Sequence, residues 1–261
     1  MLKKISLLVI ILLLFSAGAS FAVTKEQRDY VSRQMLSKIT KESGEPKELP
    51  PDSRVSGIFR SLLKETSRKD VKYRASVVDS KDINAYALPD GQVVFYSGLL
   101  KALPADNNAP LAFVAAHELA HIERHHADKK IERALISGGI LTILTHKSKE
   151  WMQLLGGVAF GLINSGYSRE FETDADKQAL IMMHKAGYDP NGSLVVFKMF
   201  SDMEKKGGGI RIFPSHPKPK DRYKNAIAWM KENHVAIHEP GLTGTTPDAK
   251  ISAPPPQPAV K

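Results

Sequence analysis

The spacing of apolar residues along the chain predicts a mostly helical protein. Apolar positions that recur three or four residues apart form one face of a helix. This spacing occurs in five segments, which are 24–43, 53–66, 168–186, 191–205 and 219–233. From Leu111 onward almost every stretch has a helical pattern, so we expect helices to make up most of the fold.

Between residues 71 and 96 the pattern changes to that of short strands. Residues 71–80, 84–88 and 92–96 are rich in β-branched and aromatic side chains. The sequence Pro-Asp-Gly at 89–91 is a turn signal between the second and third of these segments. We therefore expect a small meander or hairpin sheet beside the helices, and an α+β fold that is mostly α.

Two further apolar stretches, 136–145 and 151–163, contain glycine. A straight helix needs about 20 apolar residues to cross a bilayer, and both stretches are shorter. We expect buried or interfacial helices here. Peripheral contact with a membrane, or contact with a substrate, is the alternative.

The two ends of the chain have compositions of their own. A basic start, an apolar run over 5–15 and small residues up to Ala22 are typical of a secretory signal peptide. We expect residues 1–22 to be removed after Ala22, with cleavage after Ala19 as the second choice and an uncleaved membrane anchor as the alternative. The pattern predicts export, most simply to the bacterial periplasm.

The expected folded domain spans 23–239, and the Pro-rich segment 240–261 predicts a disordered tail. The chain of 261 residues has no cysteine, which excludes disulfides, thiol nucleophiles, thiolate metal sites and a lipid-modified N-terminal cysteine. The net charge of +9 alone indicates neither a membrane nor a nucleic-acid partner. Because the chain is expected to be exported, we expect no nucleic-acid partner.

Residues 117–121 read His-Glu-Leu-Ala-His inside an apolar helical run. His117 and His121 lie one turn apart on one helix face, so both imidazoles can bind one zinc ion. Glu118 points about 100° around the helix, where it can take a proton from a water beside the metal. The apolar flanks argue against two solvated histidines, because unpaired polar groups cost free energy there. The motif predicts a zinc-dependent hydrolase.

A catalytic zinc site needs a third protein ligand. A histidine six residues beyond the motif is excluded, because position 124 is Arg and position 127 is Ala. Glu172 and Asp176 lie one helical turn apart, so one can bind the metal while the other orients a ligand imidazole. Taken alone, such a pair is also typical of a solvated acidic face.

The sequence HELAH, followed about fifty residues later by SREFETDAD, resembles the M48 family of zinc metallopeptidases. This family includes the CAAX-prenyl endopeptidase, the membrane heat-shock protease and periplasmic quality-control proteases. Its pattern SR-x-x-E-x-x-A-D is matched by Ser168, Arg169, Glu172, Ala175 and Asp176. The resemblance implies a zincin-like fold with a small sheet beside the HExxH helix and one zinc ion per chain. It implies that Glu172 is the third zinc ligand. It also implies that Asp176 orients one of the zinc-binding histidines, with His117 as the first choice.

Two other segments extend the resemblance to about residues 50–232. Residues 84–100 are similar to the strand region of the family, and Ser-His-Pro at 215–217 with Arg222 is similar to its HP-x-x-x-x-R element. The comparison favours His216 over Tyr167 as the donor to the developing oxyanion, with Arg222 supporting it. The alternatives for His216 are a cap over the zinc in a resting state and a structural histidine before proline.

We also expect residues 92–97 to form an edge strand that binds substrate backbone by β-augmentation, a mode that suits unfolded proteins. The residues assigned to this role are Val93, Val94, Phe95 and Tyr96. For His125 and His126 we expect a role beside the metal ligands or a structural one, because His125 continues the 117–121 row about 6 Å further along the helix. Arg124 is expected to pair with a carboxylate or to be solvated.

By resemblance, the function is quality control, with unfolded or misassembled envelope proteins as substrates. One rival is a gated or latent protease that acts mainly as a chaperone-like assembly factor. A second is a protease anchored to the membrane by residues 1–22. A third is a structural or storage zinc site, which would not need Glu118.

Overall fold

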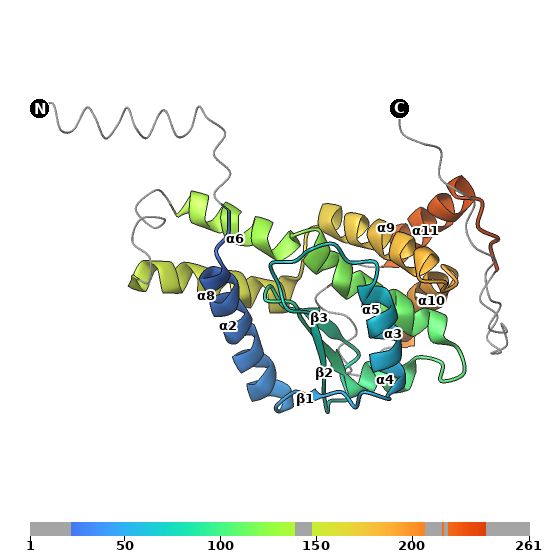
Figure 1. Cartoon of the computed structure of the whole chain (residues 1–261), viewed down its shortest axis with the longest axis horizontal. Coiled ribbons are helices and arrows are strands. Elements are labelled where there is room, and N and C mark those ends of the chain that lie inside the picture. Colours follow the sequence, from blue (N-terminus) through green and yellow to red (C-terminus); the bar gives the residue numbers. More distant parts are fainter. Residues whose placement is uncertain (1–21, 139–147, 207–215, 217–218, 239–261) are drawn as a thin grey trace, which may run out of the picture.

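The computed structural model describes residues 22–138, 148–206, 216 and 219–238, drawn in colour in Figure 1. The expected signal peptide, most of the apolar stretch 136–145 and the Pro-rich tail lie outside the described residues. No helix in the described part of the chain is both long and apolar enough to cross a bilayer.

Helices make up most of the described chain. Their bounds are α2 Lys25–Ser43, α3 Arg54–Leu63, α4 Ser97–Ala102, α5 Asn108–Glu123, α6 His126–Ser137, α8 Lys149–Ser165, α9 Arg169–Lys185, α10 Gly192–Lys206 and α11 Pro219–Glu232. The five helices predicted from apolar spacing are confirmed as α2, α3, α9, α10 and α11. Capping explains several starts, since the hydroxyls of Thr24, Ser53 and Ser168 accept backbone N–H bonds in the first turns of α2, α3 and α9.

The small sheet has four strands in the order β1-β2-β4-β3. Their bounds are β1 Lys47–Glu48, β2 Arg74–Val78, β3 Ala85–Ala87 and β4 Gln92–Tyr96. β3 and β4 form the expected antiparallel hairpin, but β2 pairs with β4 in parallel. The sheet is therefore not a meander, because the chain crosses over between β2 and β3 and returns along the far side of β4.

This topology overturns one prediction. β4 lies between β2 and β3, so its backbone groups bond to strands on both sides and residues 92–97 are not an edge strand. Val93, Val94 and Phe95 are 0% exposed, and Tyr96 is buried as well. Residues 93–96 are a run of four apolar residues, which fits a central strand covered on both faces. Such a strand does not show the alternation of apolar and polar residues that marks a strand with one solvated face.

α5 is the central helix of the fold. It packs against α3, α9, α10 and β3, and all of its residues from Ala109 to Ile122 are buried. A helix that is apolar on every side is typical of such a position. In Figure 1 the sheet lies near the middle of the molecule, with α2, α6 and α8 on one side of it and α3, α10 and α11 on the other.

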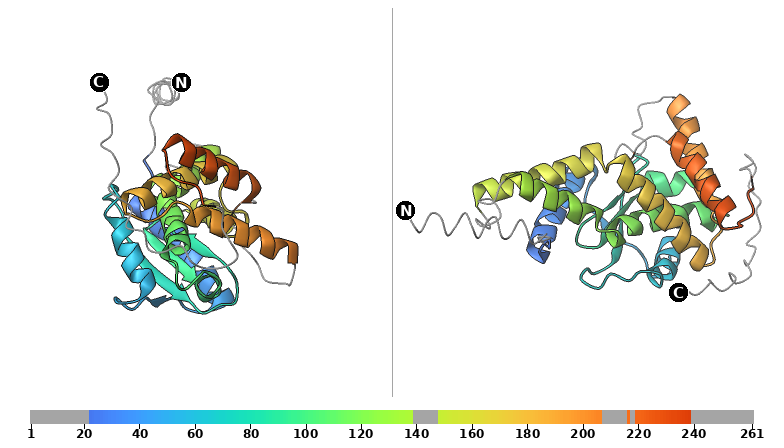
Figure 2. Two further views of the ribbon diagram at one scale, coloured as in Figure 1. Left: turned by 90° about the vertical axis from the view of Figure 1, so that its right-hand side faces the viewer. Right: turned by 90° about the horizontal axis from the view of Figure 1, so that it is seen from above.

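α6 and α8 lie side by side at one end of the molecule and pack with α2, as the view from above in Figure 2 shows. Trp151, Leu155 and Leu162 of α8 are buried in this second apolar cluster, while Phe160 is 62% exposed. The prediction of a partly buried helix over 151–163 is confirmed. A sharp turn separates α5 from α6, and its residue His125 has a φ of 57°.

Candidate metal centre

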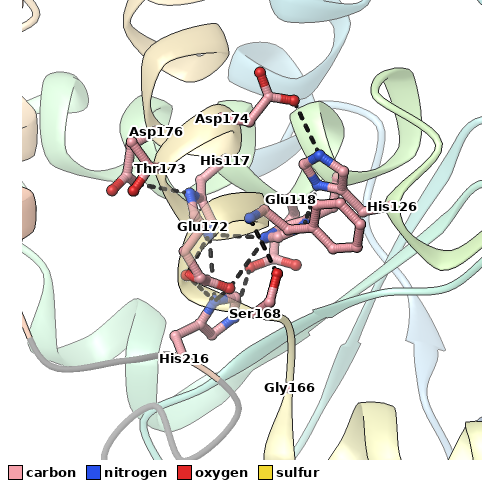
Figure 3. Close-up of polar contacts among 12 residues, drawn as sticks. His117, Glu118, His126, Gly166, Ser168, Glu172, Thr173, Asp174, Asp176 and His216 are labelled. Carbon is pink, nitrogen blue, oxygen red and sulfur yellow. Dashed lines mark hydrogen bonds and ion pairs between the residues drawn. The ribbon is translucent and has the colours of Figure 1, made fainter. Parts of the chain in front are cut away.

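Four buried side chains from distant parts of the sequence converge beside α5. His117 and His121 come from α5, Glu172 from the first turn of α9, and His216 from the segment before α11. One ligand atom from each lies within 4.8 Å of all the others. Figure 3 shows the imidazole of His216 facing the carboxylate of Glu172 and the imidazole of His117. The structure thus brings together the three predicted metal ligands and adds His216.

The separations between these donor atoms fit a metal ion. Four donors bound tetrahedrally at 2.0–2.1 Å lie about 3.3 Å apart. The Nε2 atoms of His117 and His121 are 3.1 Å apart, and oxygens of Glu172 lie 3.6 Å and 3.5 Å from them. Nδ1 of His216 is 3.3 Å from Nε2 of His117 and 2.8 Å from Glu172 Oε1. A set of imidazole nitrogens with one carboxylate is a donor set that divalent ions such as zinc accept.

Helix geometry explains how Glu172 reaches the cluster. Ser168 caps α9, and Glu172 is in the first turn, where the positive end of the helix dipole favours an acidic side chain. Burial alone would raise the pKa of Glu172, but the neighbouring imidazoles of His216, His117 and His121 hold it well below the usual range. Glu172 is therefore a carboxylate that the cluster stabilises.

Glu118 lies next to the cluster and is 1% exposed. The backbone N–H of Ala87 in β3 donates to its carboxylate. Among the described residues Oε1 of Glu118 has no hydrogen-bond partner, although Nε2 of His216 is 3.5 Å away. Burial raises the pKa of Glu118, against the lowering effect of the nearby imidazoles. A buried carboxylate oxygen without a partner is the arrangement expected of a proton acceptor.

Asp176 and Arg222 support His117 from behind. Nδ1 of His117 lies 2.9 Å from Asp176 Oδ1, and Nε and Nη2 of Arg222 each donate to the same carboxylate at 2.7 Å. Burial would lower the pKa of His117, but hydrogen bonds with Asp176 and Glu172 raise it to about 9. A proton held on Nδ1 leaves Nε2 directed at the cluster, as in metal-binding histidines.

His121 has a corresponding support from His126, which fits the expectation of a role beside the metal ligands. Its Nδ1 lies 2.9 Å from Nδ1 of His126, and Nε2 of His126 lies 3.0 Å from Asp174 Oδ2. Arg124 donates to the same Asp174 oxygen at 2.8 Å, which matches the prediction that Arg124 pairs with a carboxylate.

Helical spacing could not identify His121 as the contact partner of His126, because the two residues do not lie on one continuous helix. A residue five positions after His121 would face away on a continuous helix. α5 ends at Glu123, and the left-handed conformation of His125 turns the chain so that His126 points back toward His121. The same turn takes His125 out of the 117–121 row, and its contact with Asp128 fits the expected structural role.

Two aromatic rings cover this side of the centre. Tyr167 stacks on His121, with ring centroids 4.0 Å apart and an angle of 14° between the planes. Phe171 stacks on His126 at 4.5 Å and 12°. Burial raises the pKa of Tyr167 well above its ordinary value, so its phenol keeps its proton. Tyr167 is thus placed as a packing partner of a metal-ligand imidazole.

Arg222 contacts the acidic pair of α9, and its expected support of His216 stays a prediction. Its described contacts go to Asp176, to Glu172 at 3.4 Å and to Nδ1 of His117 at 3.4 Å. The ring of His216 instead contacts Glu172 and His117. Arg222 therefore stabilises the acidic pair of α9.

The strand nearest the centre is β3, and this corrects the assignment of Val93–Tyr96 as the substrate strand. Asn84 accepts a backbone bond from Tyr96, and Leu88 donates one to Gln92, so the even-numbered residues of this segment face β4. The backbone groups of Ala85 and Ala87 point the other way. The bond from Ala87 to Glu118 shows that this outward side of β3 meets the candidate site.

Comparisons with known proteins agree with this geometry. The mitochondrial metalloendopeptidase OMA1 of Schizosaccharomyces pombe is 30% identical over 187 residues, which are 69% of this chain and 53% of that protein. The metalloprotease LoiP of Escherichia coli is 27% identical over 213 residues, 78% of this chain and 79% of that protein. The beta-barrel assembly-enhancing protease of Escherichia coli is 23% identical over 228 residues, 81% of this chain and 45% of that protein.

This chain therefore spans about half the length of the OMA1 protein and somewhat less of the beta-barrel assembly-enhancing protease. The model of peptidase family M48 matches residues 51–230, which is more than half of the chain and contains all four residues of the buried cluster. The chain belongs to peptidase family M48.

Proposed function

We propose that this protein is a zinc-dependent endopeptidase that hydrolyses peptide bonds in unfolded or misassembled proteins of the bacterial cell envelope. The observation that carries the proposal is the buried set of metal donors with Glu118 beside it, whose Oε1 has no hydrogen-bond partner among the described residues. A structural zinc site has no use for such a carboxylate. The family assignment supports the same reaction class.

His117, His121 and Glu172 would hold the ion. When bound, zinc supplies Lewis acidity toward the scissile carbonyl and makes a nearby water more acidic. Glu118 accepts the proton of the attacking water on Oε1 and passes it to the leaving amine. Its burial favours the protonated form, which keeps the proton available for the second transfer.

A gated form of this enzyme is the second candidate, because His216 lies within the donor set. A catalytic zinc site keeps one position open for substrate, whereas His216 would occupy the fourth position in the arrangement seen here. In a gated enzyme His216 would cap the site at rest and would have to move away to admit substrate. In the arrangement seen here its Nε2 lies 3.5 Å from Oε1 of Glu118, so a donor role toward the oxyanion stays a second possibility for the same ring.

The outward backbone of β3 is the proposed binding edge for an extended substrate. An added strand would pair with Ala85 and run past Glu118, and strand addition reads backbone rather than side chains. This mode suits unfolded proteins of many sequences. The proposed peptidase domain spans residues 23–239, and an exported, periplasmic location follows from the signal-peptide pattern of residues 1–22.

Casein degradation tests the proposal. Purified wild-type protein and Glu118→Gln would be compared for cleavage, with the zinc content of both measured. We expect cleavage by the wild type only, with equal zinc in the two proteins, because the substitution removes the proton acceptor and leaves the metal donors in place. If neither protein holds zinc, or if Glu118→Gln cleaves as fast as the wild type, the proposal is wrong.

His216→Ala separates the open enzyme from the gated one. A gated enzyme cleaves faster once its cap is removed, and it retains zinc through the other three ligands. If His216 acts only as a donor to the oxyanion, the substitution lowers kcat by about 100-fold or more. Lys101→Gln, on the exposed face of α4, is the control for changes in handling and purity.

A further inference from the structure

A pocket of about 660 Å³ lies between α6 and α8, beside the metal centre but formed by other residues. Lys130 and Arg133 of α6 line one side, and Gly157 and Gly161 of α8 line the other. The family site does not include these residues, and none of them is a metal donor. The pocket therefore needs a separate explanation.

The aromatic residues Tyr167 and Phe171 connect this pocket with the metal centre. Both line the pocket, and Tyr167 stacks on the ligand imidazole of His121 at 4.0 Å. The ammonium group of Lys130 lies 5.7 Å from the centre of the Tyr167 ring. Tyr167 therefore borders both the pocket and the metal centre.

The floor of the pocket is apolar because α8 presents glycines there. A Cβ added at Gly157 or at Gly161 would meet no atom within 4 Å, so the space beside both residues is open. These glycines are four positions apart and lie on one face of α8. Leu154 and Val158 complete an apolar surface. Such a surface suits an apolar side chain of a ligand.

The rim of the pocket is cationic and lacks a protein counter-charge. Lys130 donates to the carbonyl of Gly166 at 2.6 Å, and the Arg133 guanidinium lies 5.0 Å from the ring of Phe171. Within residues 22–138, 148–206, 216 and 219–238, no carboxylate forms an ion pair with either cation. Burial lowers the pKa of Lys130, with no acidic neighbour to oppose it. An anionic group entering the pocket would supply the missing partner.

We propose that this pocket is a substrate subsite that takes an apolar side chain next to a carboxylate, with Lys130 and Arg133 binding the carboxylate. The carboxylate comes either from the C-terminus of the substrate or from an Asp or Glu side chain, since both present the same chemistry. The inference rests on the proposed function and adds a preference to it. A polypeptide is favoured over an anionic lipid because the pocket shares Tyr167 with the metal centre.

Peptide binding to the zinc-loaded Glu118→Gln protein tests this subsite without turnover. The probes are three fluorescent decapeptides of one sequence: one ends in Leu-Phe with a free carboxylate, one ends in Leu-Phe amide, and one carries an internal Leu-Asp with an amide end. Fluorescence anisotropy gives their Kd values. We expect one or both carboxylate peptides to bind about fivefold or more tightly than the amide, and which of them does so identifies the source of the carboxylate.

Two variants of the pocket make the test specific. Gly161→Leu fills the floor and should weaken all three peptides, and Arg133→Gln should remove only the preference for the carboxylate. Leu is the better helix former, so Gly161→Leu is expected to keep α8 folded. Gly156→Leu is the matched control, because Gly156 also has open space around it and does not line the pocket. Lys101→Gln controls for loss of one positive charge.

Three results would overturn the subsite. These are equal Kd values for acid and amide peptides, peptide binding that Gly161→Leu leaves unchanged, and no binding of any peptide up to about 1 mM. Binding of phosphatidylglycerol vesicles that Gly161→Leu abolishes, without peptide discrimination, would assign the pocket to lipid and also overturn the proposal. Failure of casein cleavage with peptide discrimination intact would instead refute the proposed function and leave the subsite in place.

Discussion

Nδ1 of His126 lies 2.9 Å from Nδ1 of His121, and this contact sets the proton positions on both rings. Nε2 of His121 faces the metal donors, so Nδ1 must carry the proton and donate it to His126. His126 must then accept through Nδ1 and donate from Nε2 to Asp174. Burial lowers the pKa of His126 to about 4, although the hydrogen bond with Asp174 opposes this, and a neutral ring at pH 7 meets that requirement.

Replacement of His126 by Leu should weaken zinc binding by about 10- to 100-fold, because the ring of His121 loses the group that orients it. Competition with a chromophoric zinc chelator measures the affinity. His125→Asn is the control, since Asn tolerates the positive φ at this position and His125 does not contact the cluster. Unchanged zinc affinity in His126→Leu would mean that Tyr167 stacking alone orients His121.

Arg222→Leu should lower the free energy of unfolding of the metal-free protein by about 3 kcal/mol or more, because it removes the guanidinium that pairs with the buried carboxylates of Asp176 and Glu172. Arg222→Lys should lower the free energy of unfolding by less, because lysine keeps the positive charge but cannot form the bidentate contact with the Asp176 carboxylate. Urea unfolding followed by circular dichroism gives both values. A loss below about 1 kcal/mol for Arg222→Leu would show that these carboxylates are compensated in another way.

Tyr73 and Glu123 give a pH-dependent contribution to stability. Tyr73 donates a hydrogen bond to Glu123, which also accepts backbone bonds from Ser67 and Arg68. Burial would raise the pKa of Glu123, but these bonds lower it, and burial with the bond to Glu123 raises the pKa of Tyr73. The stability contribution of Glu123 is present above its unfolded pKa of about 4.3. It is lost as the pH falls through the lower pKa of Glu123 in the folded protein. The stability contribution of Tyr73 is present below its unfolded pKa of about 10. It is lost as the pH rises through the higher pKa of Tyr73 in the folded protein.

Tyr73→Phe should therefore cost about 1 kcal/mol of unfolding free energy at pH 7 and less at both pH extremes. Urea unfolding at several pH values measures the difference from the wild type. Tyr188→Phe is the matched control, because Tyr188 shares its hydrogen bond with the uncharged Ser61. An equal cost for Tyr73→Phe at pH 3 and pH 7 would contradict the assignment to Glu123.

Gly192→Ala should destabilise the fold by about 1–3 kcal/mol, because α10 begins where its backbone touches that of Ala109 in α5. A Cβ at Gly192 would overlap the carbonyl group of Ala109, which cannot move without shifting α5. Gly57→Ala, inside α3 with nothing near the added methyl group, should instead be neutral or stabilising. Thermal unfolding of the two variants makes the comparison, and equal Tm values would refute it.

Local spacing predicts the parts of the candidate site that lie on one helix. His117 and His121 share a face of α5, and Glu172 and Asp176 share a face of α9, because four residues make about one turn. The approach of these two helices depends on packing between distant segments, which spacing does not encode. Sequence reasoning joined them through family resemblance rather than through physics.

The errors in the sequence-based interpretation share a cause. β2 and β4 pair in parallel although β3 lies between them in the sequence, and nothing in either segment indicates its partner. His126 reaches His121 only through the reversal at His125, which ends a helix that the apolar pattern alone would continue. In both cases one change in chain direction altered which residues meet.

The contact between His117 and His216 spans 99 residues of chain, and Arg222 joins the cluster from still further along. A polypeptide that emerges N-terminus first exposes the HExxH helix long before its last ligand and its last cation follow. An incomplete product that stops before His216 has neither the cap nor the counter-charge of the centre. The three predicted ligands and Glu118 thus precede, in the order of synthesis, the residues that cap and stabilise the centre.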